Sequence, residues 1–161
     1  MRGAARAPRR LTMPTTPMST TEPRGTVLVV DDEESAGRLV RLHFSAWRVV
    51  QAYDLTSAAT AIAAAEDLRL ILLDLNLGDT TYPESLLDNP FQGSFALARQ
   101  VRRAHPRVPI VIFSADWGTG IASAAQRVGA EFVFKRDCSH SLKALRRRLE
   151  LAPKSGIWTF V

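Results

Sequence analysis

Short apolar runs recur along the chain between residues 26 and 135, and more polar stretches separate them. The runs are rich in Val, Ile and Leu and too short for membrane spans, which is typical of strands buried on both faces of a sheet. They predict strands at residues 26–30, 48–53, 68–75, 108–115 and 131–135.

The stretches between these runs carry apolar residues at helical spacing. They predict helices at residues 34–46, 57–68, 94–105, 122–129 and 139–151. The second of these helices is rich in alanine, and we expect Ser57 to be its N-cap. Gly37 weakens the first helix, and Gly129 is expected to end the fourth.

Strands that alternate with helices form a parallel sheet, because each helix carries the chain back to the start of the next strand. The prediction is an α/β domain at residues 26–151 with a doubly wound, five-stranded parallel sheet. Residues 1–25 are rich in Pro, Thr and Arg and predict a disordered arm, and residues 152–161 are a C-terminal tail. Ligands bind at the carboxyl ends of the strands in such folds.

The net charge of +5 looks at first like a signal for nucleic-acid binding. Residues 1–25 carry +4 of this charge, however, and residues 26–161 carry only +1. A nearly neutral folded part disfavours nucleic acid as a partner. We expect the arm to be a solvated basic tail, and contact with an acidic partner is the alternative.

A cytoplasmic protein without membrane association is expected. Cys138 is the only cysteine of the chain, which excludes an internal disulfide and fits a reducing compartment. The apolar runs are far too short to span a bilayer, and residues 1–25 contain no apolar core of a signal peptide.

Polar residues follow the predicted strands at the points where the strands end. The first strand ends at Asp31 and Asp32, the third ends in Asp74, the fourth in Ser114 and the fifth in Lys135. Adjacent carboxylates at the end of a buried strand repel each other and resist desolvation. A hard divalent cation relieves this repulsion, and Mg²⁺ prefers oxygen ligands and pairs well with phosphoryl groups.

The segments VLVVDDEES, LILLDLN, PIVIFSA and GAEFVFK occur in the order and near the spacing found in receiver domains of two-component response regulators. Residues 26–150 resemble that family. The resemblance implies a flavodoxin-like receiver fold with strand order 2-1-3-4-5. It also implies a role in phosphorelay signal transduction.

The resemblance implies specific roles for the residues at the strand ends. Asp74 would be the phosphoacceptor, taking a phosphoryl group from a histidine kinase or a phosphotransfer protein to form an aspartyl phosphate. Asp31, Asp32, Asp74 and the backbone carbonyl of Asn76 would hold Mg²⁺. Lys135 would pair with the phosphoryl oxygens or, before phosphorylation, with Asp74.

The resemblance also implies a switch. Ser114 would move toward the phosphoryl group and donate its hydroxyl to it, and Phe132 would rotate inward in response. Asn76 and Asp116 occupy the positions that tune dephosphorylation in the family. An amide and a carboxylate there can orient an attacking water, so we expect a short-lived phosphoryl group.

Two stretches depart from the family pattern. Residues 79–92 lengthen the loop after the third strand, and Gly78 stands where the family has a proline. This insertion is either a self-packed surface loop, which we favour slightly, or a flap that covers the site or docks a partner. Arg136 replaces the proline that usually follows the lysine, which removes a reason for a cis peptide between Lys135 and Arg136.

The main hypothesis is a stand-alone response regulator, because only about ten residues follow the receiver region, too few for an output domain. Its output would be a phosphorylation-dependent interaction with a protein target. The family's usual surface for signalling and for homodimers comprises the fourth helix, the fifth strand and the fifth helix, here 122–129, 131–135 and 139–151. No enzymatic activity is expected beyond its own phosphorylation and dephosphorylation.

The alternative hypothesis is a phosphorylation-independent pseudo-receiver that acts as a protein-binding module. The long loop and the missing proline favour it, whereas the intact acidic residues, hydroxyl and lysine argue against it. A phosphatase with an aspartate nucleophile is disfavoured, because Asn76 stands where a second acid is needed. A DNA-binding regulator is disfavoured by the nearly neutral folded part.

Overall fold

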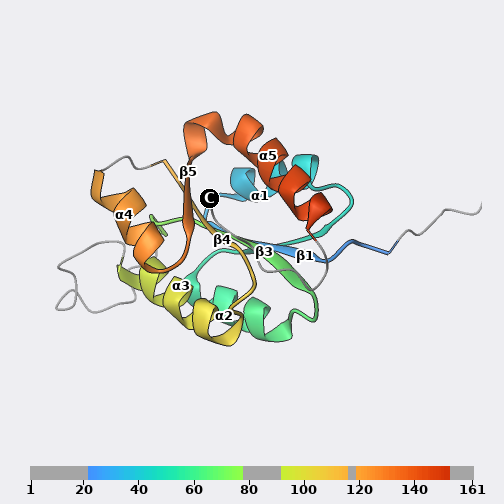
Figure 1. The fold of residues 1–161 in the computed structure, drawn as a ribbon. Helices are drawn as coiled ribbons and strands as arrows, with labels where there is room; N and C mark the ends of the chain where they lie inside the picture. Colours follow the sequence, from blue (N-terminus) through green and yellow to red (C-terminus); the bar gives the residue numbers. More distant parts are fainter. Residues whose placement is uncertain (1–21, 78–91, 116–118, 153–161) are drawn as a thin grey trace, which may run out of the picture.

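A five-stranded parallel sheet runs through the middle of the molecule and carries helices on both faces (Figure 1). The computed structural model describes residues 22–77, 92–115 and 119–152. The strand order is β2-β1-β3-β4-β5. The predicted doubly wound fold and its strand order are therefore confirmed.

The strands and helices alternate along the described residues as predicted. The strands are β1 (Thr26–Val30), β2 (Arg48–Ala52), β3 (Leu68–Leu73), β4 (Ile110–Ser114) and β5 (Glu131–Phe134). The helices are α1 (Glu34–His43), α2 (Leu55–Ala64), α3 (Gln92–Ala104), α4 (Thr119–Arg127) and α5 (Cys138–Leu151), with a short 3-10 helix η2 (Lys135–Asp137). None of the described helices has both the length and the apolar character that crossing a bilayer requires.

The start of α2 differs from the prediction. Its N-cap is Asp54, whose Oδ1 accepts a hydrogen bond of 2.6 Å from the backbone N–H of Ser57. The Ser57 hydroxyl in turn accepts from the backbone N–H of Asp54 at 3.2 Å. This reciprocal capping box satisfies donors that the first turn leaves free. Ser57 is thus the third helical residue, and its prediction as the N-cap was wrong.

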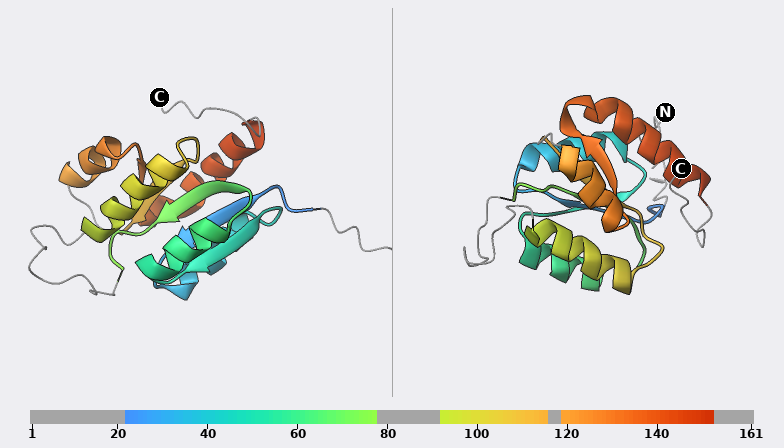
Figure 2. Two further views of the ribbon diagram at one scale, coloured as in Figure 1. Left: turned by 90° about the horizontal axis from the view of Figure 1, so that it is seen from below. Right: turned by 60° about the vertical axis from the view of Figure 1, so that its left-hand side comes forward.

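The two faces of the sheet bury separate apolar clusters, since side chains alternate along each strand. Val27 and Val29 of β1 lie in the cluster beneath α1 and α5, whereas Leu28 and Val30 lie in the cluster beneath α2, α3 and α4. Figure 2 shows the two helical layers on either side of the sheet. The sheet is therefore buried on both faces, as its continuous apolar strands require.

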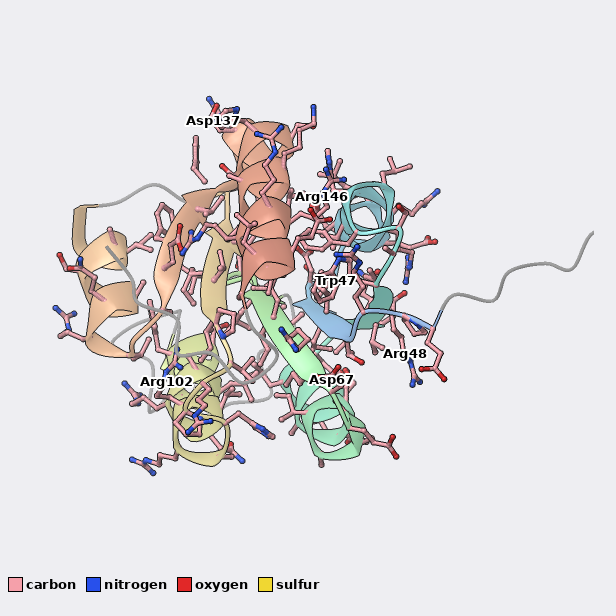
Figure 3. The ribbon with its side chains drawn as sticks, turned by 45° about the vertical axis from the view of Figure 1, so that its right-hand side comes forward. Trp47, Arg48, Asp67, Arg102, Asp137 and Arg146 are labelled. Carbon is pink, nitrogen blue, oxygen red and sulfur yellow. The ribbon has the colours of Figure 1, made fainter. Side chains whose placement is uncertain are left out.

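Aromatic side chains fill the space between α1 and α5. Phe44 is fully buried, and its ring meets that of Trp47 edge to face, with the centroids 6.3 Å apart. Trp47 lies between the sheet and α5 (Figure 3), and it belongs to the same cluster as Leu145 and Leu149. Such burial of large apolar side chains is the main stabilising term of a fold of this kind.

Arg102 of α3, labelled in Figure 3, links the loop between α3 and β4 to the turn that follows α4. Its guanidinium donates to the carbonyls of Pro106 at 2.8 Å and Val108 at 3.1 Å, and to the carbonyl of Gly129. Gly129 follows α4 with φ +69°, in the left-handed region that favours glycine. As predicted, it ends α4, and an added Cβ would lie 3.1 Å from Nε of Arg102.

Replacing Gly129 tests this turn. Gly129→Ala should lower the free energy of unfolding by about 1–2 kcal/mol, because a Cβ is strained at positive φ. Denaturant unfolding measures the change. Gly120→Ala in the same region is the matched control, since an added Cβ there meets nothing within 4 Å. An equal effect of the two substitutions would contradict the assignment.

Candidate functional site

The carboxyl ends of the strands carry the polar residues singled out in the sequence. Asp31 follows β1, Asp74 follows β3, Ser114 ends β4 and Lys135 follows β5. The parallel register pairs Val30 with Leu73, so the next residues along both strands, Asp31 and Asp74, emerge side by side. The sheet thereby brings two carboxylates, a hydroxyl and an ammonium from the ends of four strands to one edge.

Lys135 lies between two buried carboxylates. Its Nζ is 2.8 Å from Oδ2 of Asp31 and 2.8 Å from Oδ2 of Asp74. Asp31 is 1% exposed and Asp74 is 5% exposed. The ammonium also lies 5.9 Å from the centroid of the buried Phe113 ring, a cation–π distance. One cation therefore joins residues that follow β1, β3 and β5.

Three carboxylates crowd this edge. Asp31, Asp32 and Asp74 each offer an oxygen within 4.8 Å of the others. Asp32 is exposed, in contrast to its two partners. A single ammonium cannot neutralise three carboxylates at this distance, so the cluster carries excess negative charge.

Burial and the ion pairs shift the pKa values of Asp31 and Lys135. Burial raises the pKa of the Asp31 carboxyl above its ordinary value, although the hydrogen bond and charge of Lys135 act in the opposite direction. Burial alone would lower the pKa of Lys135, but hydrogen bonds and charges from Asp31 and Asp74 outweigh it and raise that pKa. The ammonium thus stays charged, while the buried Asp31 carboxylate is only partly compensated.

The donor set fits a hard divalent cation. Oδ2 of Asp31 is buried, and its close contact in the described structure is the ion pair with the Lys135 ammonium at 2.8 Å. Asp74 shares the same ammonium, so a further cation would offset the negative charge that Lys135 alone leaves on the three carboxylates. Clustered carboxylate oxygens are also the ligands that Mg²⁺ and Ca²⁺ prefer.

Backbone contacts hold Asp74 in place. Its N–H donates to the carbonyl of Val30 at 2.9 Å, and its own Oδ1 accepts from the N–H of Leu75 at 2.8 Å. The hydroxyl of Ser94, in the first turn of α3, donates to the Asp74 carbonyl at 2.9 Å. Ser94 is buried and joins α3 to the end of β3. This contact was not predicted from the sequence, because twenty positions separate Ser94 from Asp74.

Two residues of β2, Gln51 and Ala52, make hydrogen bonds to the turn after β1. Oδ1 of Asp31 accepts from the N–H of Glu33 at 3.0 Å, and the N–H of Asp31 donates to the carbonyl of Ala52 at 2.9 Å. Nε2 of Gln51 donates to the carbonyls of Asp31 at 3.1 Å and Glu33 at 2.9 Å. Gln51 was also missed, since a polar residue on an edge strand has no distinctive sequence signal.

The remaining residues singled out in the sequence occupy different settings. Ser114 is fully buried at the end of β4, and Asn76 is exposed two residues beyond Asp74. Phe132 is half-buried and packs against the cluster beneath α2, α3 and α4. Asp116, Gly78 and nearly all of the 79–92 insertion lie outside the described residues.

The chain after β5 turns without a cis peptide. No described peptide bond is cis, the bond between Lys135 and Arg136 included. The chain passes directly into η2 at Lys135, and the Arg136 guanidinium lies 5.7 Å from the centroid of the Phe134 ring. Arg136 therefore has a local aromatic contact within the described structure.

Comparisons with protein-family models and with curated proteins find no match. Among solved structures, the chain is similar to the receiver domain of NtrX from Brucella abortus, at 29% identity and a TM-score of 0.62, with 78% of this chain and 99% of that chain covered. A response regulator from Thermotoga maritima matches at 20% identity and a TM-score of 0.63, over 78% of this chain and 96% of that one. The BeF3-activated DrrB receiver domain matches at 16% identity and a TM-score of 0.62, over 78% and 97%.

A longer NtrX chain, in complex with ADP, matches at 28% identity and a TM-score of 0.59 over 78% of this chain. The match spans only 26% of that longer chain. The similarity therefore concerns a domain-sized part of the longer protein.

The buried charge of Asp31 predicts how stability should change with pH and on removal of that charge. Because the pKa of Asp31 is raised in the folded state, its ionisation lowers stability as the pH rises through that pKa. Asp31→Asn keeps an acceptor for the Glu33 N–H but removes the charge. It should raise the melting temperature by a few degrees at pH 7 without divalent cations, and this gain should vanish in acid. Thermal unfolding between pH 3 and pH 7 measures it.

Added Mg²⁺ should raise the melting temperature of the wild type, and Asp31→Asn should lose most of that gain. Asp67→Asn is the control, because the exposed Asp67 carboxylate has, among the described residues, only a 3.9 Å ion-pair contact with Arg69. A lower melting temperature for Asp31→Asn at pH 7 would mean that the ion pair with Lys135 outweighs the cost of burial.

Proposed function

Because the folded part of this chain is a receiver domain of the response-regulator type, we propose that it accepts a phosphoryl group on Asp74 with Mg²⁺ bound. We further propose that it acts as a stand-alone regulator whose phosphorylation controls binding to a protein target. The receiver would extend over residues 26–151, between an arm at 1–25 and a tail at 152–161.

One observation carries this proposal. The Asp74 carboxylate lies at the carboxyl edge of the sheet, 2.8 Å from the Lys135 ammonium and within 4.8 Å of the Asp31 and Asp32 carboxylates. A nucleophilic oxygen is thus placed beside a cation that can receive a phosphoryl oxygen and beside ligands for a metal ion. Phosphoryl transfer needs this kind of positioning more than it needs covalent chemistry by the protein.

In the proposed reaction, a carboxylate oxygen of Asp74 attacks the phosphorus of a phosphohistidine on the donor protein. A phosphorus–oxygen bond forms, the phosphorus–nitrogen bond breaks, and the imidazole of the donor leaves with the bonding electrons. Lys135 turns from the Asp74 carboxylate to an oxygen of the transferred group, and its raised pKa keeps it charged. Mg²⁺, held by Asp31, Asp32, Asp74 and the carbonyl of Asn76, supplies neutralisation of phosphoryl charge when bound.

The response to phosphorylation is proposed to run through β4 and β5. Ser114 would donate its hydroxyl to the phosphoryl group. Phe132, paired in register with Ile112 two residues before Ser114, would rotate inward from its half-buried position. Asn76 and Asp116 would orient the water that removes the phosphoryl group, which makes the phosphorylated state short-lived.

The proposed partners are a histidine kinase or a phosphotransfer protein as donor and a protein target for output. The face formed by α4, β5 and α5 is the proposed output surface and homodimer interface. On this face Arg148 of α5 donates to both oxygens of Glu131 of β5, at 2.8 and 3.1 Å. A cytoplasmic location is part of the proposal, because it is where kinase domains act.

Intact-mass measurement with the small phosphodonor phosphoramidate and Mg²⁺ tests this function. Wild-type protein should gain one phosphoryl group, whereas Asp74→Asn should gain none, because an amide nitrogen replaces the nucleophilic oxygen. Asp67→Asn, which changes an exposed carboxylate outside the cluster, should be phosphorylated like wild type. The phosphorylated wild type should lose the group within minutes to an hour.

Two other outcomes of these measurements would contradict parts of the proposed function. A phosphorylated form that is stable for many hours would reject the proposed roles of Asn76 and Asp116. Failure of the wild type both to bind Mg²⁺ and to gain a phosphoryl group would favour a phosphorylation-independent binding module on the same fold.

A further inference from the structure

The turn from Asp31 to Glu33 carries two of the three clustered carboxylates, and a side chain from the neighbouring strand holds its peptide groups. Gln51 is the fourth residue of β2 and pairs in register with Val29, two residues before Asp31. From there its Nε2 reaches the carbonyls of Asp31 and Glu33, at 3.1 and 2.9 Å. One amide group therefore bridges both ends of the acidic turn.

The chemistry of the amide sets its orientation. A glutamine NH₂ group has two hydrogens to donate, and both meet a carbonyl oxygen here. The opposite orientation would place Oε1 against two carbonyl oxygens, which repel it. Gln51 thus acts on the turn as a double donor, and neither an apolar nor an acidic side chain could replace it in this role.

Gly37 of α1 makes the room for this side chain. A Cβ added at Gly37 would stand 1.8 Å from Oε1 and 2.6 Å from Cδ of Gln51. Any other residue would therefore push the amide away from the turn. Gly37 is buried inside a helix, where glycine is less favourable than alanine. The helix thus carries an unfavourable residue at the one place where Gln51 needs space.

Oε1 of Gln51 is buried and makes no hydrogen bond within the described structure. An unsatisfied buried acceptor lowers stability, and such a group calls for an explanation other than packing. We infer that Gln51, admitted by Gly37, is a positioning residue that holds the Asp31–Glu33 turn in the conformation that presents Asp31 and Asp32 to a divalent cation.

This inference rests on the proposed function, since it concerns the same cation site. The same turn carries the Asp32 carboxylate, which lies within 4.8 Å of the carboxylates of Asp31 and Asp74. A turn ordered beforehand reduces the conformational entropy that cation binding must otherwise overcome. The Asp31 hydrogen bonds to Ala52 and Glu33 do not involve Gln51, so its loss should loosen the turn without unfolding the domain.

The first experiment replaces Gln51 by methionine in the full chain, which preserves side-chain length but removes the donors. Mg²⁺ is titrated while the backbone amide signals of Glu33 and Leu75 are followed by NMR, because both amides donate to carboxylate oxygens of the cluster. The dissociation constant should rise about tenfold, as for other residues that orient metal ligands. The Glu33 signal should also shift or broaden before any Mg²⁺ is added.

The matched control is Gln126→Met, a change on the exposed face of α4 that should leave Mg²⁺ affinity unaltered. Melting temperatures without divalent cations are measured for both variants, because a purely structural role of Gln51 would lower stability without changing the affinity of the folded protein for Mg²⁺. Should Gln51→Met unfold, Gly37→Ala carries the test, since alanine favours the helix while displacing the amide.

A double-mutant cycle separates the mechanism from indirect effects. Gly37→Ala alone should weaken Mg²⁺ binding about as much as Gln51→Met. In a Gln51→Ala background, where the space is open, Gly37→Ala should cause no further loss of affinity. Wild-type affinity in Gln51→Met or in Gly37→Ala would overturn the inference while leaving the proposed function intact. Absence of saturable Mg²⁺ binding in the wild type would overturn both.

Discussion

The ion pairs of Lys135 with Asp31 and Asp74 are the constraint on which the polar edge of this protein depends. The two carboxylates are almost wholly buried, and one ammonium lies 2.8 Å from each. The three residues follow β1, β3 and β5, so this contact exists only when the strands take the order found here. Without the ammonium, two buried carboxylates would face each other unpaired, which is strongly unfavourable.

The remaining contacts at this edge follow from that arrangement. One ammonium leaves the cluster of Asp31, Asp32 and Asp74 with excess negative charge, which the proposed divalent cation would offset. Polar contacts from outside the cluster then fix the backbone beneath it. Ser94 holds the end of β3, and Gln51 holds the turn after β1. The apolar sheet below supplies rigidity, while the polar edge concentrates the chemistry.

Much of the fold and of the charged cluster can be predicted from the sequence. Continuous apolar strands between amphipathic segments predicted the doubly wound sheet, and family resemblance supplied its strand order. The positions of Asp31, Asp74 and Lys135 directly after strands predicted that they would meet. The N-cap of α2 was misplaced, because the choice between Asp54 and Ser57 depends on a reciprocal hydrogen bond that a residue pattern does not distinguish.

Local residue patterns and the parallel direction of the strands were enough to predict the sheet, the acidic residues at strand ends and the lysine that faces them. Three contacts emerge only from the packed fold: Gln51 reaches the carbonyl of Glu33, eighteen positions earlier, Gly37 leaves space for Gln51, and the Ser94 hydroxyl donates to the Asp74 carbonyl. Such contacts depend on strand register and side-chain reach across elements. No short stretch of sequence encodes that geometry, because it arises only when the separate segments pack together.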